Sequence, residues 1–211
     1  MGRATTARSA GHKLIRSVGS GTFTSTSATI TVPGTLAGDA IVALASTSGT
    51  PTLTGSGAGG TWNTYRGGSA APYCFAMVGM NCSAGQTSFT ITVSASQAIQ
   101  YVWFVISGVG TTIRAVPTTW GWTSSTGTVS GSFNPFVGDL VICGFSQFNG
   151  ATITVANSQS QQVQQRGINT SNQRPVVGFA FVDRTGFAQT VTPTWGNSQT
   201  GGGVVLIFKN S

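Results

Sequence analysis

The side chains that could carry out chemistry are few and scattered along the sequence. The 211 residues include one histidine, His12, and three acidic residues, Asp39, Asp139 and Asp183. Glycoside hydrolysis needs two carboxyl groups about 5–10 Å apart, and a hydrolytic triad needs a histidine held in register. His12 lies in a short N-terminal arm, and two of the aspartates each follow a glycine directly before an apolar run. The sequence therefore predicts a protein that is not an enzyme.

Metal, phosphate and cofactor sites are also not expected. Cys74, Cys82 and Cys143 form no CxxC pair, so they indicate neither a zinc site nor a disulfide framework, and we expect free, partly buried thiols. The glycine-rich run GSGAGG at 55–60 lacks the Lys-Ser/Thr pair and the helix of a phosphate-binding loop. That run predicts a flexible hairpin tip.

The first candidate for partner binding is the N-terminal arm, residues 1–13. It carries Arg3, Arg8 and Lys13, which supply three of the ten Lys and Arg side chains behind the net charge of +7. Spaced cations between small residues suit an extended strap on an acidic protein surface, or loose contact with phosphates. A disordered tail is an equally open interpretation. Nucleic-acid binding is not expected as the main role, because three cations would release few counterions.

A tryptophan pair and a polar stretch are the remaining candidates. In a strand, Trp120 and Trp122 would point to one face. They could stack on a sugar or a partner protein, or fill the junction between two domains, which is the interpretation we favour. The Gln- and Asn-rich residues 157–174 predict an exposed hairpin or loop, or an inter-subunit contact.

The elements that must position these residues are all predicted to be β-strands. Only 6% of the residues are charged, and 30 are glycine. Apolar and polar residues alternate in TFTSTSATITV (22–32) and TSFTITVSAS (87–96), with turn signals about every ten residues. This pattern predicts antiparallel β-sandwiches of Ig-like or jelly-roll-like topology, two alternatives that the sequence leaves open. The most apolar run, 101–109, is too short to cross a bilayer and predicts a buried strand, so we expect no membrane contact.

An internal repeat divides the chain. Residues 38–67 align without a gap on residues 138–167, and three further segments match with small shifts. The matched segments are IRSV (15–18) with IRAV (113–116), FAMV (75–78) with FAFV (179–182), and VWFVI (102–106) with VVLIF (204–208). We therefore predict an arm (1–13) and two tandem sandwiches, 14–110 and 111–211.

The charged residues also match between the repeats. Arg16, Asp39 and Arg66 correspond to Arg114, Asp139 and Arg166. One interpretation is a repeated ligand site. The interpretation that we favour is an aspartate that accepts a turn hydrogen bond ahead of a central strand and pairs with an arginine.

A family resemblance rests on the order of several phrases. VPGTLAGDAIVALAS is followed by TLTGSGAGGTWNTY, then by YCFAMV and YVWFVISGV. This order resembles β-sandwich modules of tailed-bacteriophage virion proteins, over both copies. The second copy departs from it, with Gln162 in place of the tryptophan and Lys-Asn-Ser in place of Ser-Gly-Val.

What the resemblance implies is a structural or adhesive role in a virus particle. We expect a non-enzymatic virion protein that decorates or cements the capsid, present as a homo-oligomer or in many copies per particle and bound to the major capsid protein or other virion proteins. The alternative is a tail- or fibre-associated module that binds carbohydrate on the host, with Trp62, Tyr65, Trp120 or Trp122 as stacking platforms.

Overall fold

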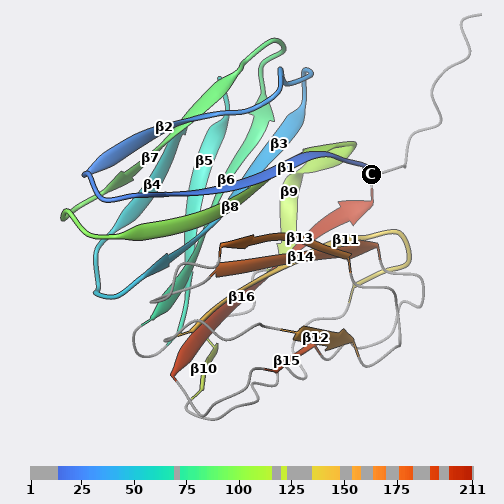
Figure 1. The fold of residues 1–211 in the computed structure, drawn as a ribbon. Helices are drawn as coiled ribbons and strands as arrows, with labels where there is room; N and C mark the ends of the chain where they lie inside the picture. The colour runs from blue at the N-terminus through green and yellow to red at the C-terminus, as the bar shows by residue number, and fades with distance from the viewer. Residues whose placement is uncertain are drawn as a thin grey trace, which may run out of the picture.

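All regular structure in the described part of the chain is β-strand. A computed structural model describes residues 14–68, 72–115, 120–122, 135–147, 154–157, 164–169, 176–182, 191–194 and 200–210. The strands in these ranges pair antiparallel (Figure 1). The described residues contain no helix that could span a membrane. The all-β prediction is confirmed.

The first half of the chain forms a large and a small sheet. Its strands are β1 (Leu14–Phe23), β2 (Ser27–Thr31), β3 (Asp39–Thr47), β4 (Leu53–Gly57), β5 (Thr61–Gly67), β6 (Tyr73–Cys82), β7 (Ser88–Val93) and β8 (Ile99–Ser107). The first large sheet has the strand order β1-β8-β3-β6-β5, and the first small sheet has the order β2-β7-β4.

The second half forms another large and another small sheet. Its strands are β9 (Val109–Ala115), β10 (Trp120–Trp122), β11 (Leu140–Gln147), β12 (Thr154–Asn157), β13 (Gln164–Asn169), β14 (Val176–Val182), β15 (Val191–Thr194) and β16 (Gly201–Asn210). The second large sheet has the order β10-β16-β11-β14-β13, with β9 also paired to β16, and the second small sheet is β12-β15. If β9 and β10 together are taken as the equivalent of β1, the second large sheet has the same strand order as the first large sheet.

The two large sheets pack face to face. In β3, Ala40, Val42 and Leu44 face the second large sheet, and the alternate residues Ile41 and Ala43 face the first small sheet. All nine residues of β3 are buried, because each face of the strand is covered. The run GDAIVALAS is therefore continuously apolar rather than alternating, as is expected of a strand with no solvent-facing side.

Glycines on the second large sheet make room for bulky side chains of the first. A Cβ atom on Gly144 would lie 2.9 Å from Leu44 Cδ2, and one on Gly178 would lie 2.7 Å from Phe104 Cζ. Leu44 and Gly144 occupy matched positions of the sequence repeat, 100 residues apart. The large and the small residue fit each other where the two sheets meet, as close packing requires.

The pairing register of the central strands changes one part of the alignment between the two halves of the sequence. Ala45 of β3 lies opposite Phe75, whereas Phe145 of β11 lies opposite Val177. Phe75 therefore corresponds to Val177 and not to Phe179, so FAMV (75–78) matches 177–180. Because side chains repeat every second residue along a strand, a shift of two leaves the apolar pattern unchanged and is invisible to it.

Local patterns were more informative about turns and faces. The GSGAGG run turns the chain from β4 to β5, with positive φ angles at Gly57, Ala58 and Gly59. The prediction of a hairpin tip there is wrong, because β4 pairs with β7 in the first small sheet and β5 pairs with β6 in the first large sheet. The alternation in β2 and β7 places apolar residues inside and hydroxyls outside. On its outer face the first small sheet carries only serine and threonine, namely Ser27, Thr29, Thr31, Thr54, Ser56, Ser88, Thr90 and Thr92.

Candidate interaction surface

Two matched turns lead into the central strands β3 and β11. In the first, the Asp39 amide donates to the Leu36 carbonyl at 3.1 Å, and the Leu36 amide donates to Asp39 Oδ2 at 2.8 Å. In the second, the Asp139 amide donates to the Phe136 carbonyl at 2.8 Å, and the Phe136 amide donates to Asp139 Oδ2 at 2.9 Å. The prediction of an aspartate that closes a turn is confirmed at Asp39 and at Asp139.

A glycine is required at the third position of each turn. Gly38 has a φ of 81° and Gly138 a φ of 89°. A turn closed between its first and fourth residues with positive φ at the third is of type II, a conformation that side chains with a Cβ rarely adopt. The Gly-Asp pair in each copy is thus explained by backbone geometry and hydrogen bonding.

Arg16 holds the first turn to the edge strand. The register of β1 shifts between Ile15 and Ser17, so Arg16 sits at a β-bulge. Its guanidinium forms an ion pair with Asp39 at 2.5 Å, and the Ser107 hydroxyl donates to the other oxygen of the same carboxylate. The register of β9 shifts at the matched residue, Arg114, whose side chain lies outside the described ones.

The turns expose apolar side chains. Four large apolar residues are exposed in the described part of the chain: Leu36 (46%), Phe136 (57%), Val137 (61%) and Val182 (40%). Leu36 and Phe136 are the first residues of the two turns, and Val137 follows Phe136. Val182 is the last residue of β14 and pairs with Leu140, and Leu140 follows Val137 by three residues in the sequence.

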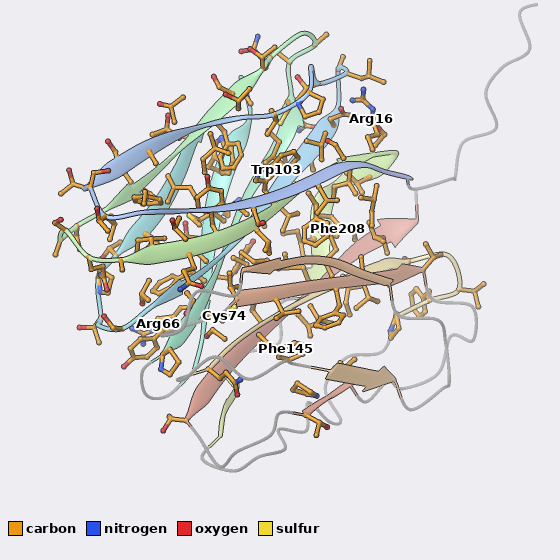
Figure 2. All side chains as sticks on the ribbon, viewed as in Figure 1. Arg16, Arg66, Cys74, Trp103, Phe145 and Phe208 are labelled. Atoms are coloured by element: carbon orange, nitrogen blue, oxygen red, sulfur yellow. The ribbon has the colours of Figure 1, made fainter. Side chains whose placement is uncertain are left out.

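These four residues lie on one side of the molecule, which we call the turn side. On the opposite side the Ser146 hydroxyl, near the end of β11, lies 3.4 Å from the Pro72 carbonyl, beside the end of β3. Because the carboxyl ends of β3 and β11 lie close together on that side, the amino ends of both strands, where the two turns are, lie on the other side of the molecule. Figure 2 shows Arg16, which holds the first turn, at the upper right, and Cys74 at the lower left. In Figure 1 the ends of β14 and β16 also point to the right.

Burial of acidic side chains leaves the described surface basic. Asp39 and Asp139 are 1% and 0% exposed, so two of the three carboxylates do not face solvent. Lys209 is exposed near the end of β16, and Arg16 lies beside the first turn, both on the turn side. The described turn side thus combines exposed apolar groups with the free cation of Lys209, because the charge of Arg16 is compensated by Asp39.

The residues proposed from sequence for partner binding are only partly described. Arg3, Arg8 and Lys13 lie outside the described residues. Trp120 and Trp122 form the strand β10, paired with Gly203 and Gly201, but their side chains are not among those described. Residues 164–169 of the polar stretch form β13, an edge strand of the second large sheet.

Trp62, a candidate stacking platform, is used inside the first half. Its ring stacks on Phe89 with centroids 5.6 Å apart, and its indole N–H donates to the Gly57 carbonyl at 2.8 Å. A Cβ atom on Gly55 or Gly79 would lie 2.1 or 2.5 Å from the indole ring. This packing accounts for the tryptophan through stability of the fold.

The thiols lie in the core. Cys74, Cys82 and Cys143 are buried and unpaired by disulfides, as predicted. Burial raises the pKa of all three thiols, and that of Cys82 reaches about 11 with a further contribution from the Asp39 charge. Among the residues whose positions are described, no three His, Cys, Asp or Glu side chains gather in a metal-binding group.

Comparison of the chain with protein-family models, with curated proteins and with solved structures finds no match.

Proposed function

We propose that this chain is a non-enzymatic structural protein of a bacteriophage virion, which decorates or cements the capsid. The observation that carries the proposal is the turn side: among the described residues the exposed large apolar side chains lie there, whereas the outer face of the first small sheet carries only hydroxyl groups. Such a body has one side suited to contact with another protein and a remainder that stays hydrated. The resemblance to tailed-phage β-sandwich proteins supplies the setting.

The body is proposed to consist of two sandwiches derived by internal duplication, residues 14–110 and 111–211. Three matched features support this proposal: the strand order of the large sheets, the Gly-Asp turns, and the register shifts at Arg16 and Arg114. The order β1-β8-β3-β6 facing β2-β7-β4 supports a jelly-roll-like topology over an Ig-like one. The sandwiches share the interface between their large sheets.

The N-terminal arm is proposed to act as a strap. In the sequence it carries Arg3, Arg8 and Lys13 and precedes β1, whose first residue, Leu14, pairs with Ser107 beside the first turn. A modest protein contact and a charged strap reinforce each other, because binding of one raises the effective concentration of the other. Many copies held in this way would stabilise a shell collectively.

Localisation and truncation test the proposal. Electron cryo-microscopy of purified particles is expected to show density for this protein on the outer surface of the capsid. Deletion of residues 1–13 is expected to lower its occupancy on particles while the circular dichroism spectrum and the thermal midpoint stay unchanged. Absence of the protein from particles would refute the virion role, and full occupancy after the deletion would remove the strap from it.

A further inference from the structure

The turn side is distinguished from the other described faces by its exposed apolar cluster. Phe136, Val137 and Val182 lie within one turn and the adjacent strand end, and Leu36 occupies the matched position in the first half. The outer face of the first small sheet, by contrast, carries only hydroxyl groups. Hydroxyls on such a face are already satisfied by water, so that face gains little from burial against a partner. Burial of exposed apolar side chains gives the larger gain.

Charge restricts what the turn side can bind. The chain has ten cationic side chains, and two of its three carboxylates are buried. The exposed Lys209 belongs to the turn side, where the Arg16 charge is compensated by Asp39, and in the sequence Lys13 stands directly before β1. A second copy of this chain would bring like charges together, which disfavours association. An acidic partner would be attracted at long range.

The exposed apolar side chains distinguish between two negatively charged partners, duplex nucleic acid and an acidic protein surface. Duplex nucleic acid offers phosphates at its surface and gains affinity mainly through cations. It offers little to an exposed phenylalanine and two valines. An acidic protein surface with apolar side chains satisfies both features, since protein interfaces have an apolar centre and a polar rim.

We propose that the turn side is a docking surface for an acidic protein surface that carries exposed apolar or aromatic side chains. In the virion this partner would be the shell protein, so the inference rests on the proposed function for its setting. Phe136 and Val137 supply the apolar centre of the contact. Lys209 supplies charge at its rim.

Defined polymers test the chemistry without a virion. Binding of the full chain to poly-L-glutamate, to a random glutamate–tyrosine copolymer and to duplex DNA is measured by fluorescence anisotropy at two salt concentrations. The copolymer is expected to bind most tightly, and all affinities to fall with salt. Phe136→Ser combined with Val137→Ser is expected to weaken copolymer binding about tenfold and to leave poly-L-glutamate unchanged.

Two control variants show whether binding depends on where a side chain lies and not only on its chemical type. Lys209→Gln and Arg66→Gln each remove one charge, but Arg66 lies at the opposite side, over the Tyr73 ring at 5.0 Å. Only Lys209→Gln is expected to weaken copolymer binding. Thr90→Ala, on the hydroxyl face of the first small sheet, is expected to have no effect on it.

The outcomes separate the inference from the proposed function. Copolymer binding that is absent, or that is insensitive to the Phe136/Val137 double variant, would overturn the docking surface even if the protein is found on particles. Duplex DNA that binds more tightly than the copolymer would also overturn it, in favour of a nucleic-acid surface. If the copolymer results hold but the protein is missing from particles, the docking surface stands and the virion role fails. Urea unfolding midpoints equal to that of the parent chain verify that each variant is folded.

Discussion

Leu44 and Gly144 provide a direct test of the interface between the two large sheets. Replacement of Gly144 by alanine would place a Cβ atom 2.9 and 3.0 Å from the two Cδ atoms of Leu44 and 3.1 Å from Cys74 Sγ. Because Leu44 and Cys74 are fully buried, neither side chain can move into solvent. We expect Gly144→Ala to lower the free energy of unfolding by about 2 kcal/mol through overpacking.

The partner variant has the opposite defect. Leu44→Ala removes buried methyl groups and leaves a cavity, which is expected to cost about 3 kcal/mol. In the double variant the new methyl group at position 144 enters the space that Leu44 vacates. We therefore expect the double variant to lose about 3 kcal/mol rather than the roughly 5 kcal/mol of two independent sites. For a chain of this length each kcal/mol corresponds to about 2–4 °C in the thermal midpoint.

Urea unfolding followed by circular dichroism measures these losses. Gly34→Ala is the matched control, since a Cβ atom there meets no atom within 4 Å, and its effect is expected to stay within about 0.5 kcal/mol. If the losses from Leu44→Ala and Gly144→Ala simply add in the double variant, the two residues do not meet across the interface. The face-to-face packing of the large sheets would then be refuted.

Three further predictions concern the first turn and the thiols. Asp39→Ala is expected to lower the free energy of unfolding by about 3 kcal/mol, because Arg16, the Leu36 amide and Ser107 lose a buried acceptor. Ser107→Ala removes only one of these hydrogen bonds and is expected to cost about 1 kcal/mol. Equal losses for the two variants in urea unfolding would contradict this ranking. Burial, with a smaller contribution from Asp39, raises the pKa of Cys82 from 9.0 to about 11, so the unfolded chain releases this proton first and stability falls as the pH rises between these values. Cys82→Ala should reduce that fall by about 3 kcal/mol, and an unchanged pH profile would disprove the assignment. At pH 8 a thiol reagent should label Cys74, Cys82 and Cys143 only after denaturant is added, so fast labelling of the folded chain would show that the core is open.

Strand positions and turns could be predicted because they depend on neighbouring residues. Alternation in 22–32 and 87–96 follows from the two-residue period of a strand, and the Gly-Asp turns follow from the need for positive φ at Gly38 and Gly138. The free state of the thiols followed from the absence of a CxxC spacing. The correct residue for Phe75 to match could not be found in this way, since a shift of two preserves the pattern.

The candidate surface was not predicted from the sequence. The sequence singled out Arg3, Arg8, Lys13, Trp120 and Trp122, whereas the exposed Phe136, Val137 and Val182 were not recognised. One signal was available: Phe136 stands at the position of Leu36 in the repeat, two residues before the Gly-Asp pair, as the first residue of a turn between strands. Its exposure could be established only once the neighbouring strands were placed.

By itself the sequence determined which segments are strands, where the chain turns, and that buried runs such as DAIVALAS need cover. Tertiary structure decided what supplies that cover. Leu44 meets Gly144, and Phe104 meets Gly178, across two sheets that are far apart along the chain. Backbone periodicity is a local property, whereas the fit of a large side chain over a glycine depends on long-range pairing and on the direction in which two sheets face each other.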